Sequence, residues 1–137
     1  MAKLRQGGCQ CGALRYEIAG EPVALVACHC TDCQRQSGSA FGMSLIVKRE
    51  HFRWLGGEPR TFVTKGDSGA RKDCLLCGDC GSRIYNATAK LPDTLNVKPG
   101  TLDDTSWLAP SLHVWTDSKQ PWTPIPEGVR CFERNPG

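Results

Sequence analysis

The spacing of nine cysteines constrains this chain of 137 residues more than any other feature of its sequence. Seven of them fall into three short clusters, at residues 9–11, 28–33 and 77–80. An odd number of cysteines would leave one thiol over in a closed set of disulfides. In a reducing compartment, cysteines clustered in this way bind metal or do chemistry more often than they form disulfides. We therefore interpret the three clusters as metal ligands.

The compartment follows from the hydrophobicity of the amino-terminal segment. No apolar run follows Lys3 and Arg5, and the longest apolar stretch, at 23–28, has only six residues. This stretch is too short for a signal peptide or for a membrane span. The sequence therefore predicts a cytoplasmic protein without a membrane segment.

The charge of the chain does not favour nucleic-acid binding. The formal net charge is +3, and two Zn²⁺ ions held by seven thiolates would reduce it to zero. The 17 lysines and arginines are spread along the sequence and form no basic run. The charge pattern therefore disfavours a nucleic acid as the partner.

The first and third cysteine clusters each provide half of a zinc site. Cys9 and Cys11 are two residues apart, so in an extended segment both sulfurs would point to the same side. Cys77 and Cys80 form a C-x-x-C-G motif that is typical of one half of a Cys₄ zinc site. Together they predict a structural Zn²⁺, whose binding free energy would stabilise a chain with only 39% apolar residues.

The middle cluster, Cys28, Cys30 and Cys33, has three thiols and no clearly assigned fourth cysteine. Three protein ligands with one open position are typical of a catalytic zinc site. A substrate thiol could complete the coordination, because soft sulfur ligands suit this ion. The metal would lower the pKa of that thiol and hold it as a nucleophile.

The roles of Cys74, Cys131 and His29 stay open at this point. His29 or Cys74 could close the middle cluster into a second structural site. In an extended strand, however, His29 would point away from its neighbours Cys28 and Cys30. Cys74 could also be a spare or alternate ligand near Cys77, and Cys131 is most simply a free thiol.

Short β-prone segments separated by turns make up most of the chain, which contains 15 glycines and 9 prolines. We expect strands at residues 13–18, 23–28, 39–47, 52–55, 60–64, 84–86, 94–97 and 112–115. No segment has a sustained helical period. The pattern therefore predicts a mostly β fold, and the length predicts one domain over residues 1–137.

The exceptions to strand structure are few. We expect one short helical turn after Cys30, capped by Thr31 or Asp32, and another at 102–107. The proline-rich tail at 120–137 is expected to run extended over the surface. Two aromatic residues in it would pin it to the domain, namely Trp122 and Phe132.

The order of motifs resembles that of the glutathione-dependent formaldehyde-activating enzyme and centromere protein V family. The motifs are Gly8-Cys-x-Cys-Gly12, Cys28-x-Cys-x-x-Cys33, Ser37-Gly-Ser-Ala-Phe41, Ser68-Gly69, Cys77-x-x-Cys-Gly-Ser82, His113-Val-Trp115 and Pro121-Trp122. They span nearly the whole chain, and the cysteine spacing is the most specific part. The chain departs from the pattern at Asp73-Cys74, where the resemblance leads us to expect an aromatic residue.

The resemblance implies a single domain of mostly antiparallel sheets joined by zinc, called a β-tent. It implies a structural zinc on Cys9, Cys11, Cys77 and Cys80, and a more labile catalytic zinc on Cys28, Cys30 and Cys33. The activity it implies is condensation of formaldehyde with glutathione to S-hydroxymethylglutathione, a carbon–sulfur bond formation or its reverse (a lyase). Fold and cysteines alone do not fix the substrate in such a family.

The leading hypothesis is therefore a carbon–sulfur lyase or synthase in which a zinc-bound thiol adds to a small aldehyde. Glutathione is the expected co-substrate, and its carboxylates need basic partners. Arg35 is the basic residue nearest the middle cluster in sequence, although a surface position fits it equally well. Asp32 or His29 could move a proton. A solvent-exposed spacer role suits His29 as well.

The residues His113 and Trp115 share one face of an expected strand, with Trp122 packed near them. Packing in the core explains them better than a role in the site.

Two other classes of function compete with the enzyme. A binding module with two closed zinc sites would recognise a protein or RNA surface without turnover. A zinc-buffering or redox-responsive protein would release metal from the middle cluster on oxidation. The incomplete middle cluster favours the enzyme and the redox-responsive protein over the binding module.

Overall fold

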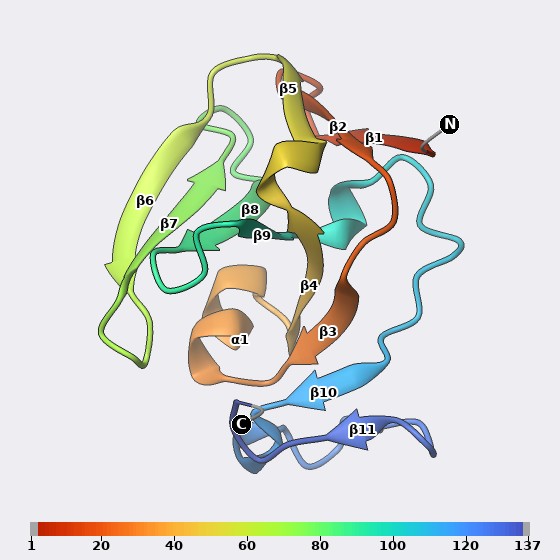
Figure 1. Ribbon diagram of the computed structural model, residues 1–137. Coiled ribbons are helices and arrows are strands. Elements are labelled where there is room, and N and C mark those ends of the chain that lie inside the picture. Colours follow the sequence, from red (N-terminus) through yellow and green to blue (C-terminus); the bar gives the residue numbers. More distant parts are fainter. Residues whose placement is uncertain (1–2, 136–137) are drawn as a thin grey trace.

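A computed structural model describes residues 3–135, which form two β-sheets and one α-helix (Figure 1). The smaller sheet is antiparallel, with strand order β1 (Leu4–Gly8), β2 (Arg15–Ala19) and β5 (Phe52–Gly56). The larger sheet has the order β11 (Arg130–Cys131), β10 (Leu112–Val114), β3 (Ala24–Cys28), β4 (Gly42–Lys48), β9 (Thr94–Val97), β8 (Arg83–Thr88), β7 (Arg71–Leu76) and β6 (Arg60–Lys65). Its strands are antiparallel, except that β10 is parallel to both β3 and β11.

The helix α1 (Thr31–Ser37) connects β3 to β4 and packs near β4 (Figure 1). None of the helices in the described part of the chain has the length and hydropathy needed to cross a membrane.

Side chains from both sheets form the main apolar core. Burial alternates along β2, where Tyr16 and Ile18 are buried and their neighbours are partly exposed, as a strand with one packed face requires. From the larger sheet the core receives Leu45, Val47, Ile84, Tyr85, Leu95 and Val97. The smaller sheet therefore packs against the middle of the larger one, and the connections between their strands meet at the rim of this core.

One close approach explains why β1 carries glycine. A Cβ atom at Gly7 would lie 2.5 Å from both the Tyr16 hydroxyl oxygen and the Thr101 carbonyl oxygen. The same Tyr16 hydroxyl is 2.7 Å from the Thr101 hydroxyl oxygen. Only glycine leaves room for this contact, so the glycine that weakens the strand signal is required by packing.

The prediction of a mostly β fold is confirmed, and each expected segment contains a strand. Three strands were not expected, namely β1, β7 and β11. The sequence of β7, Arg71–Leu76, has no clear alternation of apolar and polar residues, and pairing with β6 and β8 on both sides makes it a strand. The expected helical turn at 102–107 is reduced to one hydrogen-bonded turn at residues 106–107, closed by the Leu108 N–H and the Thr105 carbonyl at 3.2 Å, and the 3-10 helix lies earlier, at Pro99–Thr101.

The contacts that hold the tail differ from the expected ones. Trp122 is 71% exposed and does not pin it. The tail is held instead by β11, by the buried Thr123 and by main-chain bonds such as Thr116 N–H to the Phe132 carbonyl, 3.2 Å. The last tail residues, 136–137, lie outside the described residues.

The expected strand at 112–115 is also shorter than predicted. Trp115 leaves β10 with a left-handed backbone (φ 58°), so it does not share a strand face with the buried His113. Its indole N–H donates to Asn135 at 2.9 Å, so the tail, and not the core, holds this ring.

The position of the core predicts how two leucines respond to the same substitution. Leu45 on β4 is 1% exposed, so Leu45→Ala should lower the free energy of unfolding by about 2–5 kcal/mol through a buried cavity. Leu55 on β5 is 43% exposed, so the matched Leu55→Ala should cost less than about 1 kcal/mol. Urea unfolding of both variants measures the difference. Equal losses would contradict a core between the two sheets.

Candidate metal centres

Four cysteine sulfurs from two distant connections meet at one point, which we call the four-sulfur cluster. Cys9 and Cys11 lie between β1 and β2, and Cys77 and Cys80 lie between β7 and β8. All four Sγ atoms lie within 4.8 Å of one another, with 3.6 Å between those of Cys9 and Cys11 and 3.7 Å between those of Cys11 and Cys77. A tetrahedral zinc with four sulfurs at about 2.3 Å places those sulfurs about 3.8 Å apart. The cluster therefore has the dimensions of a Cys₄ zinc site.

Both halves of the four-sulfur cluster are tight turns. The Gly12 N–H donates to the Cys9 carbonyl (3.1 Å), and the Gly81 N–H donates to the Cys77 carbonyl (2.9 Å). Gly12 and Gly81 have φ of 82° and 80°, a conformation that glycine adopts without steric cost. The expected extended conformation of residues 9–11 is thus wrong, and a turn brings the two sulfurs together instead.

Hydrogen bonds to sulfur favour thiolates at Cys9 and Cys80 of the four-sulfur cluster, whereas the neighbouring sulfurs raise the pKa of Cys11 to about 12. The Leu14 N–H donates to the Cys9 sulfur (3.2 Å). The Ser82 hydroxyl, 3.3 Å from the Cys80 sulfur, lowers the pKa of that thiol to about 5. Ser82 also accepts from the Gln10 N–H at 3.0 Å, and so ties the two turns together. Deprotonated sulfurs are the form that binds metal.

The second group, Cys28, Cys30 and Cys33, is called the three-sulfur cluster. Cys28 ends β3, and Cys30 and Cys33 lie at the start of α1, with all three sulfurs within 4.8 Å of one another. The helix is capped by the Cys30 sulfur, which accepts from the Cys33 N–H at 3.3 Å. This corrects the expectation that Thr31 or Asp32 caps it. Cys30 therefore caps the helix and also places its sulfur beside the sulfurs of Cys28 and Cys33.

The surroundings of the three-sulfur cluster favour one thiolate, at Cys30, whereas hydrogen bonding among the sulfurs and burial raise the pKa values of Cys28 and Cys33. Hydrogen bonding from Cys28 and Cys33 lowers the pKa of the Cys30 thiol, and Lys72 adds to this effect. Lys98 lies near Cys28 and Cys33, and burial lowers its pKa while these sulfurs oppose that change. The sequence offered no signal for either lysine, because both reach the cluster through the pairing of distant strands.

No fourth cysteine, histidine or carboxylate of the described residues joins the three-sulfur cluster. Cys74 is fully buried on β7 and belongs to neither cluster, and Cys131 is an exposed free thiol. Asp32 is exposed on α1. The structure therefore brings together all seven predicted ligands in two groups and leaves the alternative ligands apart.

His29 is fully buried, so the expectation of an exposed spacer is wrong. Its Nε2 lies 2.9 Å from Nδ1 of His113 on β10, and both rings pack against Phe41. Burial lowers the pKa of both histidines, which favours the neutral rings that such a hydrogen bond needs. The Gln34 amide and the Ser118 hydroxyl donate to the His29 carbonyl, each at 2.9 Å. These contacts fix the chain between Cys28 and Cys30.

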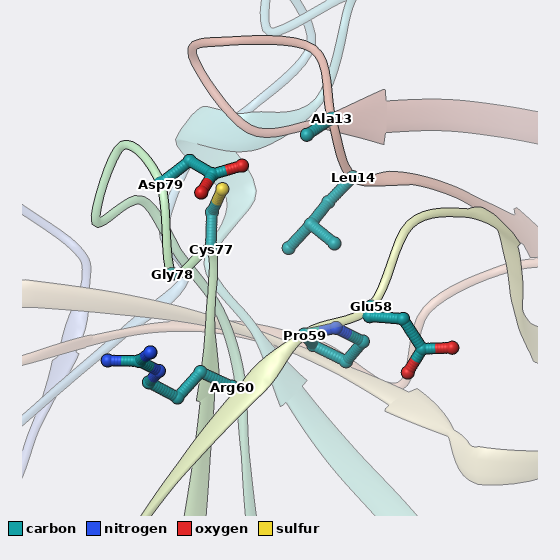
Figure 2. A pocket seen from close by; sticks show the side chains of 8 residues that line it. All are labelled: Ala13, Leu14, Glu58, Pro59, Arg60, Cys77, Gly78 and Asp79. Atoms are coloured by element: carbon teal, nitrogen blue, oxygen red, sulfur yellow. The ribbon is translucent and has the colours of Figure 1, made fainter.

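A pocket adjoins each cluster, and the two pockets differ in charge. The pocket beside the four-sulfur cluster, about 480 Å³, contains Glu58 and Asp79 with one arginine, Arg60 (Figure 2). The pocket beside the three-sulfur cluster, about 500 Å³, contains Cys33 together with Arg83 and Lys98, and no carboxylate. An anionic molecule is therefore attracted to the second pocket and repelled by the first.

Arg35 lies elsewhere. It is exposed on α1 and lines a third pocket, of about 600 Å³, together with Trp122 and Gln120. Cys33 does not line that pocket. The nearest basic residue in sequence is thus not one of the basic residues that share a pocket with the cluster.

Comparison with known proteins gives a consistent result. The family model described as "Glutathione-dependent formaldehyde-activating enzyme" matches residues 4–118. A curated protein of Halomonas elongata named "Putative glutathione-dependent formaldehyde-activating enzyme" is 22% identical, covering 97% of this chain and 89% of its own length. A crystal structure of a Rhodobacter sphaeroides protein is similar in fold, with a TM-score of 0.59 and 18% identity, covering 74% of this chain and 91% of that one. Because the family model spans most of the sequence, this chain belongs to the glutathione-dependent formaldehyde-activating enzyme family.

Proposed function

We propose that this protein catalyses the addition of a small thiol, glutathione or a close analogue, to formaldehyde or a similarly small aldehyde. The observation that carries the proposal is the three-sulfur cluster, which has no fourth ligand among the described residues and adjoins a pocket of about 500 Å³. A pocket of that size suits a small-molecule ligand. Family membership and the name of the Halomonas relative support the same chemistry.

The reaction is balanced without an oxidant or reductant. A bond forms between the thiol sulfur and the aldehyde carbon, the carbonyl π bond breaks, and the proton lost by the thiol ends on the new hydroxyl group. The reverse reaction, a carbon–sulfur lyase step, uses the same groups. The protein must therefore favour the thiolate, bring it to the aldehyde and hold both.

The seven predicted ligand cysteines would have two different roles. The four-sulfur cluster would hold a structural zinc, and Cys28, Cys30 and Cys33 would hold a second zinc. A zinc ion on the three-sulfur cluster would lower the pKa of a substrate thiol and fix its sulfur. Around it, Lys72 and Lys98 offset the negative charge of the sulfurs.

Other residues shape the reaction space. Phe41 and Met43 form an apolar part of the pocket wall beside Cys33, where a small aldehyde can lie next to the thiol. The ring of Phe41 is held from behind by the buried pair His29 and His113. The histidine pair acts as support, because neither ring lines the pocket.

Replacement of one cysteine in the three-sulfur cluster tests the proposed active site. Cys30→Ser removes a ligand that also caps α1, and should lower thiol-dependent formaldehyde turnover by about two orders of magnitude or more, with the β-sheet circular dichroism unchanged. Cys131→Ser, at the exposed free thiol, is the matched control and should keep full activity. Normal turnover in Cys30→Ser would contradict the proposal.

Metal content tests the division between the clusters. We expect elemental analysis to find about two zinc ions per chain, and dialysis against a zinc chelator to remove the zinc of the three-sulfur cluster first, because a small molecule can enter from the adjoining pocket. Cys77→Ser should lower the thermal stability far more than Cys30→Ser, because Cys77 belongs to the four-sulfur cluster, which joins turns of the two sheets. Two zinc ions that resist the chelator equally would instead support a non-catalytic binding module with two closed sites.

A further inference from the structure

We propose that Arg83 and Lys98 bind a carboxylate of the thiol substrate and so select acidic thiols over neutral ones of the same size. The inference rests on the proposed function, because it assumes that the substrate thiol reaches the three-sulfur cluster through the pocket beside Cys33. It adds two specificity-determining residues that lie 50 and 65 positions after Cys33 in the sequence.

The first observation is a buried donor without an acceptor. Nη1 of Arg83 is buried and has no hydrogen-bond partner among the described residues. Leaving a buried charged donor unpaired costs free energy, which a carboxylate acceptor would recover. Neither Arg83 nor Lys98 belongs to an ion pair in the described part of the chain, whereas Arg15, Arg53 and Arg71 are each paired with an acidic side chain.

The local backbone holds Arg83 at the pocket. The pairing of β7 with β8 shifts between Leu75 and Leu76, so that Leu75 faces Tyr85 and Leu76 faces Arg83. Such a bulge inserts one extra residue and changes the direction of the neighbouring side chains. The guanidinium also lies over the ring of Phe62, 5.8 Å from its centre. A stacked, partly buried guanidinium presents a rigid pair of donors that matches a carboxylate.

Lys98 is held just as firmly. Its N–H donates to the Ile84 carbonyl at 2.7 Å, and its carbonyl accepts from the Thr101 hydroxyl at 2.7 Å. The charged groups that act on its ammonium are the sulfurs of Cys33, Cys28 and Cys74 and the neighbouring Lys72, with no carboxylate among them. Lys98 therefore has no carboxylate partner among the described residues, and it lines the pocket together with Cys33.

The remaining lining fits a peptide-like thiol. Ser37, Ser39, Ser82 and the amide of Gln36 line the same pocket and can form hydrogen bonds with amide groups. A ligand whose sulfur reaches the three-sulfur cluster and whose acid group reaches Arg83 would span the pocket. Neutral thiols would leave the Arg83 guanidinium without an acceptor and would bind more weakly.

Calorimetric binding tests this without relying on turnover. The zinc-loaded protein should bind glutathione roughly ten- to a hundredfold more tightly than glutathione diethyl ester, and Arg83→Gln should remove most of that preference. Arg83→Lys should recover part of it, because the charge stays while the fork of donors is lost. S-methylglutathione, which has no thiol proton, should also bind more weakly to Arg83→Gln than to the parent protein.

Two control variants make the outcome specific. Arg130→Gln, at an exposed arginine on β11, should leave the preference unchanged. A loss of preference in Arg35→Gln instead of Arg83→Gln would overturn the proposal, as would equal affinity of the parent protein for the acid and its ester. Preference for the acid without any aldehyde turnover would contradict the proposed function and still support this inference.

Discussion

The meeting of Cys9 and Cys11 with Cys77 and Cys80 is the contact on which the rest of the structure depends. The two pairs come from the turn between β1 and β2, in the small sheet, and from the turn between β7 and β8, in the large sheet. Cys9 and Cys77 also belong to the apolar core that the two sheets share. An ion shared by the four sulfurs would fix the relative position of the two sheets. Cys11 and Cys77, which it would join, are 66 positions apart in the sequence.

The two cysteine clusters use the same ligand atoms and differ in completeness and surroundings. The four-sulfur cluster closes its own shell, and carboxylates of Glu58 and Asp79 line the pocket beside it. The three-sulfur cluster has one sulfur fewer, and the adjoining pocket carries only cationic side chains among its charged lining. The anionic thiol of the proposed function would thus be directed toward the cluster that has room for it, by coordination and by electrostatics together.

The sequence predicted features that depend on local spacing and missed those that depend on topology. The two groups of cysteines follow from short spacings within motifs, and strands such as β2 follow from alternation of buried and exposed residues. Strand β1 was not predicted, because Gly7 weakens its strand pattern. The close approach of the Tyr16 hydroxyl, nine residues away in the sequence, requires glycine at this position. Arg35 was favoured by proximity in sequence, whereas Arg83 reaches the pocket beside Cys33 only because eight strands pair in a particular order. The one local signal for Arg83 was its place directly after the Cys77–Cys80 motif.

The residues that follow Cys80 connect the four-sulfur cluster to the pocket beside the three-sulfur cluster. Gly81, Ser82 and Arg83 follow Cys80 without a break, and all three line the pocket that Cys33 also lines. Ser82 contacts the Cys80 sulfur, and the left-handed backbone at Gly81 sets the direction in which the chain leaves the turn. The turn that completes the four-sulfur cluster therefore also positions the guanidinium of Arg83. Loss of order in this turn would move a wall of the pocket while leaving Cys28, Cys30 and Cys33 on β3 and α1 in place. If Arg83 binds the substrate as proposed, the four-sulfur cluster would contribute to substrate recognition through the position of Arg83, although it lies outside the proposed reaction space.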